Sequence, residues 1–213
     1  MLRTQPPTKQ LRIGVYAGAF DPVHAGHISF ALQAMAAAHL DEIIFVPERR
    51  PRLKPGVEHY AHRVAMLKQA LAPHPALAVL ETVDRHATVR RTLPLLQGLF
   101  PGARLVFMMG ADTALNVLDW SGAGRLLDGC ELVVGARSAT EAKAIELEIR
   151  GWDVLPMALR VVQSFAPDVS SSHIRQALRS GNQAKGLLAS VRRYARREWL
   201  YVSPGLITAR EQA

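Results

Sequence analysis

Residues 11–38 predict a short buried strand followed by a sharp turn and a helix, and this pattern restricts the fold more than any other feature. Leu11–Tyr16 alternates apolar residues and is bounded by small ones. Residues 17–19 carry little side-chain bulk, so their backbone N–H groups can come close to a ligand. Pro22 presets the backbone near a helix start, and Ile28–Ala38 is rich in helix-forming alanine. Unpaired N–H groups at such a start attract phosphate.

Two histidines stand at this predicted helix start. His24 and His27 are three residues apart, which places them on the same side of the first helical turn. Gly26 between them leaves room for a ligand or a neighbouring chain. One alternative is a structural role for both rings. Another is a shared metal ion, but no cysteine or obvious third carboxylate accompanies the pair. Phosphate handling is the interpretation that the combination favours.

Strand-like and helix-like segments alternate along the rest of the chain. This alternation predicts an α/β, Rossmann-like, doubly wound parallel sheet with helices on both faces and a small C-terminal helical region. Such sheets bind ligands beyond the carboxyl ends of their strands, where Gly18 and Gly110 fall. Further strands are expected at Ile43–Val46, Leu77–Leu80, Leu105–Met108, Cys130–Val134 and Leu159–Gln163. Further helices are expected at Glu58–Leu71, Thr92–Leu99 with Pro94 in its first turn, Asp112–Leu118, Ala139–Arg150, Ser171–Arg179 and Ser190–Trp199.

Length and composition indicate one self-supporting domain. The chain has 213 residues, of which 49% are hydrophobic, enough for a sizeable core. We expect a nucleotide-handling domain over residues 11–202, with loose tails at 1–10 and 203–213. The single cysteine, Cys130, excludes a disulfide framework, is expected to be a buried inert thiol, and fits a reducing cytoplasm. A membrane span is not expected, because no apolar run of about 18 residues exists.

The chain is strongly basic, with a net charge of +8 and a pI of about 10.2. Such a charge suits either nucleic acid or a polyphosphate substrate. The largest basic cluster, Arg192–Arg197, falls in a predicted helix and is interpreted mainly as a solvated face. Aromatic residues make up only 6% of the chain and do not interleave with this charge, which weakens a single-strand-binding interpretation. Nucleic acid is therefore not an expected partner.

A second candidate anion site lies near the other end of the chain. Three serines, Ser170, Ser171 and Ser172, precede a predicted helix, and Arg175 follows one turn later. Any of the serines can cap the helix, and hydroxyl groups beside an arginine at a helix start can bind an anion. The segment alone also fits a simply capped helix with a surface arginine. Beside the first motif, two anion sites at separate helix starts favour one polyphosphate lying between them.

These two segments together resemble the nucleotidylyltransferase superfamily. Gly18–His27 is similar to the (H/T)xGH signature, whose fuller form in one branch is GGTFDPxHxGH. Residues 169–175, Val-Ser-Ser-Ser-His-Ile-Arg, are similar to the ISSTxIR element with which the superfamily grips the ATP triphosphate. Ala17 and Ala19 replace a glycine and a threonine, and the second change removes a hydroxyl. His173 occupies a position that is free in the family, so we expect it to be unimportant.

The resemblance implies how ATP is held. His24 and His27 are expected to meet the bridging and α-phosphate oxygens and Arg175 the β and γ phosphates, which makes these three the predicted catalytic residues. Mg²⁺ is expected as a cofactor held mainly by the ATP phosphates. Gly110 and Asp112 match a G-x-D that contacts the nucleoside, although Asp112 can also simply cap the next helix. The predicted ATP-binding residues are Gly18, Ala19, Phe20, His24, His27, Gly110, Asp112, Ser170, Ser171 and Arg175.

The acceptor side resembles the bacterial nicotinate-nucleotide adenylyltransferases less closely. Met108–Asp112 followed by Trp120 is similar to them, and there a tryptophan at this spacing stacks on the pyridine ring; a core tryptophan is the alternative. The family's Ser-Tyr-Thr near the nicotinate carboxylate is replaced by Ala87-Thr88-Val89, with Arg90 and Arg91 just beyond as replacement charges. The predicted acceptor-binding residues are Lys54, Thr88, Val89 and Trp120.

The sequence thus predicts a cytoplasmic nucleotidyltransferase whose partners are ATP and a mononucleotide. Its expected reaction transfers AMP from ATP to nicotinate mononucleotide and releases deamido-NAD and pyrophosphate. A related enzyme with another phosphorylated acceptor, such as nicotinamide mononucleotide or phosphopantetheine, or with CTP as donor, is the first alternative. A non-catalytic nucleotide- or nucleic-acid-binding protein is the second.

Overall fold

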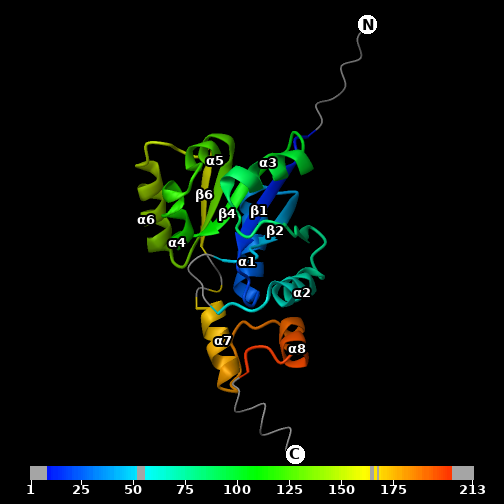
Figure 1. The fold of residues 1–213 in the computed structure, drawn as a ribbon. Coiled ribbons are helices and arrows are strands. Elements are labelled where there is room, and N and C mark those ends of the chain that lie inside the picture. Colours follow the sequence, from blue (N-terminus) through cyan, green and yellow to red (C-terminus); the bar gives the residue numbers. More distant parts are fainter. Residues whose placement is uncertain (1–8, 52–55, 164–165, 167, 203–213) are drawn as a thin grey trace, which may run out of the picture.

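The computed structural model describes residues 9–51, 56–163, 166 and 168–202. Within them one sheet of six parallel strands has the order β3-β2-β1-β4-β5-β6 (Figure 1). This order confirms the predicted Rossmann-like fold. The strands are β1 (Arg12–Gly18), β2 (Glu42–Pro47), β3 (Leu77–Val79), β4 (Arg104–Gly110), β5 (Glu131–Ala136) and β6 (Leu159–Gln163).

The sheet changes its direction of growth between β1 and β4. From β1 the chain builds outward through β2 to β3, and it then returns to the other side of β1 and builds outward from β4 to β6. The connections that leave β1 and β4 therefore diverge, and a crevice opens beyond the carboxyl ends of these two strands. Gly18 and Gly110, the last residues of β1 and β4, lie at this edge as expected.

Helices cover both faces of the sheet (Figure 1). One face packs α1, α2 and α8, and the opposite face packs α3, α5 and α6. Successive residues of β1 confirm this, because Ile13 and Val15 belong to the second core while Tyr16 packs against the first. The helices are α1 (Ala25–Ala38), α2 (Tyr60–Leu71), α3 (Val89–Leu99), α4 (Ala111–Ala114), α5 (Ala123–Gly129), α6 (Ala139–Arg150), α7 (Ser171–Arg179) and α8 (Ala189–Arg197), with a 3₁₀ turn, η1, at Val117–Asp119.

Helix α3 begins earlier than the sequence pattern predicts. It starts at Val89 rather than Thr92, because the Thr92 hydroxyl accepts the Thr88 N–H at 3.2 Å and so satisfies the helix start from inside. Pro94 therefore lies beyond the first turn of α3. The prediction that it stands in the first turn, where proline is tolerated, was wrong. The carbonyl of Arg90, which a residue at 94 would normally bond, belongs to an exposed residue that water can reach.

The region between β4 and β5 is more divided than predicted. The expected helix Asp112–Leu118 is split into α4 and the 3₁₀ turn η1, and α5 was not predicted at all. Gly122 precedes α5 with a φ of 91°, a left-handed conformation that glycine adopts without strain. Two glycines within so short a helix hid its apolar pattern.

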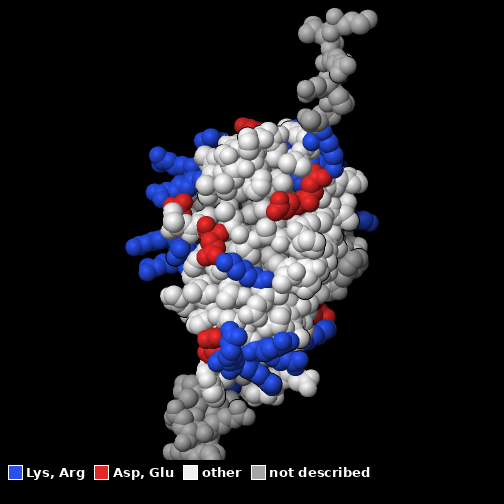
Figure 2. Space-filling view, turned by 90° about the vertical axis from the view of Figure 1, so that its right-hand side faces the viewer, with Lys and Arg blue, Asp and Glu red and all other residues white. Residues whose placement is uncertain are grey.

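The basic cluster lies on α8, at the end of the molecule away from the amino edge of the sheet (Figures 1 and 2). All four arginines, Arg192, Arg193, Arg196 and Arg197, are exposed, as a solvated face requires. The opposite side of α8 buries Val191 and Tyr194 against the core. No helix among the described residues is long and apolar enough to cross a bilayer.

A buried carboxylate organises the amino edge of the sheet. Glu131, the first residue of β5, accepts two hydrogen bonds from Arg12 at 2.7 and 3.0 Å and one from Arg160 at 3.0 Å. Burial raises the pKa of Glu131, but the hydrogen bonds and charges of these arginines outweigh it and hold the pKa below its usual range. Next to it, Cys130 is fully buried and burial raises its pKa to about 12, which agrees with an inert thiol.

We predict that Glu131→Gln lowers the free energy of unfolding by about 2 kcal/mol, because it leaves partly buried guanidinium groups without their counter-charge. Denaturant unfolding measures the loss. The matched control is Glu146→Gln, which removes an exposed carboxylate 4.0 Å from Arg150 and should cost less than about 0.5 kcal/mol. Equal losses in the two variants would contradict the role given to Glu131.

Candidate active site

A cavity of about 640 Å³ opens at the carboxyl edge of β1 and β4. Its walls come from the turn after β1, the junction of β4 with α4, and the start of α7. All ten residues predicted to bind ATP line it, so the fold brings both sequence motifs and the G-x-D segment to one site. The lining residues are Tyr16, Ala17, Gly18, Ala19, Phe20, Asp21, His24, His27, Val57, Met109, Gly110, Asp112, Thr113, Val169, Ser170, Ser171, Ser172 and Arg175.

The two histidines form one unit at the start of α1. His24 is the N-cap residue, and its backbone N–H donates to Nδ1 of His27 at 3.2 Å. The ring centroids are 3.7 Å apart. Because Nδ1 of His27 accepts this bond, a neutral His27 carries its proton on Nε2. Gly26 is needed here, since a Cβ at this position would lie 3.0 Å from the His24 ring.

Burial controls the charge of His24. Its side chain is 6% exposed, and desolvation lowers its pKa to about 4. The imidazole is therefore neutral at physiological pH and acts on a phosphate as a hydrogen-bond donor rather than as a cation. The unpaired N–H groups and dipole of α1 supply positive potential at the same place.

Small residues in the turn serve packing as well as access. A Cβ on Gly18 would lie 3.1 Å from the Phe20 ring, which is itself buried and packs edge-on against His27 at 5.2 Å between centroids. Phe20 has a φ of 49°, an unusual conformation for a residue with a side chain. The sequence had suggested only that the small residues let a ligand approach.

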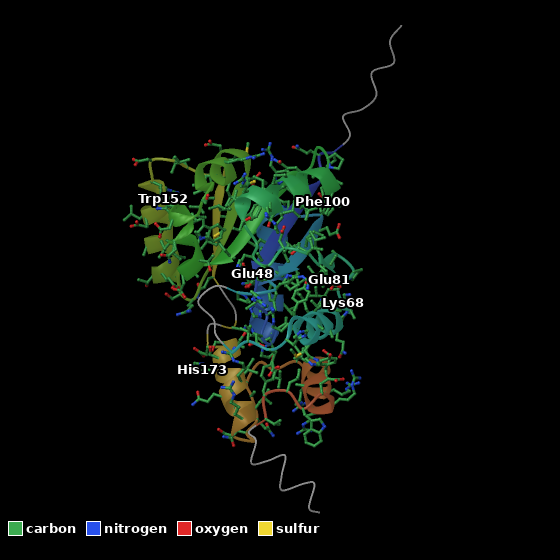
Figure 3. The ribbon with its side chains drawn as sticks, in the orientation of Figure 1. Glu48, Lys68, Glu81, Phe100, Trp152 and His173 are labelled. Atoms are coloured by element: carbon green, nitrogen blue, oxygen red, sulfur yellow. The ribbon has the colours of Figure 1, made fainter. Side chains whose placement is uncertain are left out.

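The start of α7 is fastened directly to this turn. Ser170 is the N-cap residue, and its Oγ accepts the His173 N–H at 3.2 Å. The Ser171 hydroxyl donates to the carbonyl of Pro22 at 3.0 Å. Arg175 donates to the carbonyl of Asp21 at 2.7 Å. The two predicted anion sites are thus one structure, while the side chain of His173 is exposed, as Figure 3 shows on α7.

Two residues that sequence reasoning did not assign complete the support of the turn. The Asp21 carboxylate is 1% exposed and accepts hydrogen bonds at Oδ1 from the Tyr201 hydroxyl at 2.7 Å and the Glu58 N–H at 3.3 Å. Asp21 falls within the Gly18–His27 motif, whereas Tyr201 belongs to neither of the two phosphate motifs. Their pairing spans almost the whole chain, so no local pattern could have revealed it.

Arg63 is a further unassigned residue, and it is completely buried. Among the described residues its guanidinium donates to four backbone carbonyls, those of Ala19, Glu48, Arg49 and Glu58. Glu48 lies directly after β2, as Figure 3 shows. Desolvation lowers the pKa of Arg63, and the negative charge of Asp21 is the largest influence that raises it again. The sequence feature that could have indicated a buried Arg63 is its position beside apolar residues of the predicted helix Glu58–Leu71.

The G-x-D segment lies at the opposite wall of the cavity. Gly110 is the N-cap residue of α4, so the alternative in which Asp112 caps this helix was wrong. Asp112 lies in the first turn, and its carboxylate is 3.4 Å from the Arg137 guanidinium. Both side chains are exposed, so the carboxylate remains accessible to a ligand.

The predicted acceptor residues that the structure describes do not line this cavity. Thr88 is the N-cap residue of α3, and Val89 is buried where a Cβ on Gly122 would lie 3.3 Å from it. Trp120 is the C-cap residue directly after η1, and it is 39% exposed. The alternative of a core tryptophan was therefore wrong. Lys54 lies outside the described residues. None of the other three lines the cavity, and their role in binding an acceptor stays a prediction.

The protein itself offers no metal cage in the part of the chain that the structure describes. No group of three or more histidine, cysteine, aspartate or glutamate residues is arranged there to hold a metal ion. The two histidines of the turn lie instead against each other and the aromatic side chain of Phe20.

Comparison with known proteins shows the family to which the chain belongs. The family model described as cytidylyltransferase-like matches residues 15–177. A protein of Thermus thermophilus, named "Probable nicotinate-nucleotide adenylyltransferase", is 34% identical over 82% of this chain and 90% of its own. One from Clavibacter michiganensis with the same name is 34% identical over 73% and 81%. The chain therefore belongs to the cytidylyltransferase-like nucleotidyltransferases and, within them, to the nicotinate-nucleotide adenylyltransferase family.

A solved structure shares the fold. The Plasmodium falciparum nicotinic acid mononucleotide adenylyltransferase complexed with NaAD superposes with a TM-score of 0.73 at 18% identity, over 90% of this chain and 98% of that one. The sheet order, the crevice between β1 and β4, and the helices on both faces thus agree with a known architecture of this class of enzyme.

We predict that His24 makes the protein sensitive to acid. Between pH 6.5 and about 4 the unfolded chain protonates this histidine whereas the folded protein keeps it neutral, so the free energy of unfolding falls as the pH falls. The contribution is complete above about pH 6.5 and amounts to about 3 kcal/mol. Unfolding curves at pH 7 and pH 4 measure it.

His24→Asn keeps a good N-cap residue and removes this titration. The wild-type protein should therefore lose about 3 kcal/mol more than the variant between the two pH values. His173→Asn, at an exposed position, is the matched control and should follow the wild type. Parallel curves for wild type and His24→Asn would contradict a buried neutral imidazole.

Proposed function

We propose that this protein transfers AMP from ATP to nicotinate mononucleotide, forming deamido-NAD and pyrophosphate, in the cytoplasm. The observation that carries the proposal is the single cavity in which the starts of α1 and α7 face one another. Two helix starts with His24, His27 and Arg175 suit one triphosphate lying between them. The family membership supports this reaction, since its relatives carry the name of the same activity.

The chemistry needs positioning more than covalent help. A phosphate oxygen of the mononucleotide attacks the α-phosphorus of ATP, and the bond from that phosphorus to the bridging oxygen breaks as pyrophosphate leaves. His24 and His27 donate hydrogen bonds to the α-phosphate and bridging oxygens. Arg175 stabilises the charge that develops on the leaving pyrophosphate. No protein group changes its own covalent bonds.

Magnesium arrives in this proposal as part of the substrate, bound to the ATP phosphates. The imidazoles and the guanidinium that line the cavity suit oxygen anions rather than Mg²⁺, and the described residues form no cluster of three or more histidine, cysteine or carboxylate ligands there. Gly110 and Asp112 take the nucleoside, with the exposed carboxylate of Asp112 as its polar contact. Ala19 supplies backbone only, since it lacks the hydroxyl of its family counterpart.

The acceptor binds beside the ATP cavity in this scheme. The exposed face of Trp120 stacks on the pyridine ring, and the unpaired N–H groups at the start of α3 meet the carboxylate. Val89 contributes through its backbone, because its side chain is buried against Gly122. Lys54 belongs to the same set of proposed acceptor residues.

A second candidate is the same reaction with a different acceptor. The replacement of the family's Ser-Tyr-Thr by Ala87-Thr88-Val89 removes hydroxyls from the acceptor side and motivates nicotinamide mononucleotide or phosphopantetheine. A non-catalytic nucleic-acid-binding role has less support, because the exposed arginines of α8 lie outside the cavity.

The deciding experiment measures pyrophosphate release from purified protein with MgATP and each of nicotinate mononucleotide, nicotinamide mononucleotide and phosphopantetheine. We expect nicotinate mononucleotide to give the highest kcat/KM. Higher activity with another acceptor would transfer the assignment to that substrate, and no release with any of them would reject adenylyl transfer.

We predict that Gly26→Ala lowers kcat/KM by about a hundredfold, because the new methyl group displaces the His24 ring by a few tenths of an ångström or more from the α-phosphate. Its melting temperature should change little, since alanine favours the helix and offsets the crowding. Gly124→Ala in α5 is the matched control, because a Cβ there has no atom within 4 Å. That variant should keep full activity. Unaltered turnover in Gly26→Ala would remove His24 from the mechanism.

A further inference from the structure

The geometry points to Tyr201 and Asp21 as positioning residues that hold Arg175 ready for the ATP phosphates. This inference rests on the proposed function of the cavity. It adds to that function the residues that fix the position of Arg175. Arg175 is the catalytic residue in that scheme, and Tyr201 acts on it only through the carboxylate of Asp21.

The Asp21 carboxylate is the link between the two side chains. At Oδ1 it accepts hydrogen bonds from the Tyr201 hydroxyl at 2.7 Å and from the Glu58 N–H at 3.3 Å. At Oδ2 it has no hydrogen bond in the described residues, and the nearest cation is the Arg175 Nη1 at 3.6 Å. That separation is too long for a strong hydrogen bond but short enough for attraction between charges.

Arg175 is consequently held in place while some of its N–H groups remain available to a ligand. One Nη1–H donates to the backbone carbonyl of Asp21, Nη2 donates to the Ser172 hydroxyl at a longer 3.4 Å, and the carboxylate attracts the guanidinium from one side. The side chain is 24% exposed and lines the cavity, so further N–H groups face the space that the phosphates would occupy. A carboxylate free to turn would prefer two short bonds to this guanidinium. The Tyr201 hydroxyl, which makes the shorter of the two bonds to Oδ1, is the main restraint against this turn.

The backbone on both sides of this hydrogen bond is held in an uncommon conformation. Phe20, next to Asp21, has a φ of 49°, and Tyr201 itself has a φ of 60°. Neither is a glycine, and left-handed conformations are unusual for aromatic residues. Tyr201 is 4% exposed, and the packing around it fixes the direction of its hydroxyl. The hydrogen bond between the hydroxyl and the carboxylate thus joins two segments of unusual backbone conformation.

Tyr201→Phe removes the one hydroxyl and leaves the ring in place. The carboxylate, left at Oδ1 with only the longer bond from the Glu58 N–H, should then turn to Arg175 and draw it away from the phosphates. We expect kcat/KM for ATP to fall about tenfold, while the KM of the acceptor stays the same. Tyr194→Phe is the matched control. That residue also lies in the same core and bonds a neighbour, Nδ1 of His62 at 3.0 Å, but it does not touch Asp21.

The second arm repeats both substitutions in an Arg175→Met background. If Tyr201 acts through Arg175, Tyr201→Phe should change the already reduced activity by less than about twofold there. The same tenfold loss in both backgrounds would assign Tyr201 a structural role and overturn the inference. A Tyr201→Phe enzyme that matches the wild type or Tyr194→Phe would also overturn it.

Asp21→Asn provides a second variant if Tyr201→Phe does not fold. It keeps an acceptor for the tyrosine hydroxyl but removes the charge beside Arg175. Because the same charge also compensates the buried Arg63, the part of its loss that acts through Arg175 should disappear in the Arg175→Met background, so the loss should be clearly smaller there, and an equal loss in both backgrounds would overturn the inference. Direct binding of ATP separates this inference from the proposed function. If the wild type adenylylates no acceptor, the proposed function fails, and the same pattern in the ATP dissociation constants then supports the positioning role or, by its absence, overturns it.

Discussion

The carboxyl edge of the sheet depends on one buried cation. Arg63 extends from α2 under the loops of the site. Its guanidinium donates to four backbone carbonyls, one in the connection from β1 to α1 and three in the connection from β2 to α2. Backbone carbonyls in loops need donors when they are buried, and a planar group with five N–H atoms serves several at once. Asp21, close in sequence to the bonded carbonyl of Ala19, supplies the compensating negative charge. The turn that carries both histidines is therefore shaped from beneath by an arginine that never meets the substrate.

The fold was largely predictable because its elements follow local rules. Strands such as β6 and helices such as α6 and α7 match the sequence expectation residue for residue, since apolar spacing and serine caps define them. The predictions that were wrong also have local causes. The start of α3 depends on a hydroxyl inside the helix, Thr92, rather than on the residue before it. The short α5 follows a left-handed glycine and has too few residues to show a period.

The residues that line the cavity could be predicted from the sequence, whereas the residues that hold them in place could not. His24, His27, Ser170 and Arg175 stand at helix starts, where residue type and position together indicate anion binding, and the structure brings them to one cavity. Their supports have no such signature. Whether a buried tyrosine or arginine bonds a particular carboxylate or carbonyl depends on tertiary distances, which no spacing in a sequence encodes. The acceptor side lacks a motif of comparable specificity, and neither Thr88 nor Trp120 lines the cavity.

The hydrogen bond between Asp21 and Tyr201 joins residues that are 180 positions apart. A protein is synthesised from its amino end, so the phosphate-binding turn leaves the ribosome long before its anchor does. The sheet can assemble in the meantime from strands that neighbour one another in order, but the arrangement around Arg175 has to wait for the end of α8 and the residues just after it. Synthesis as far as Tyr201 thus acts as a late assembly step of the pocket, and a polypeptide cut short before Tyr201 lacks the hydrogen bond that holds the Asp21 carboxylate.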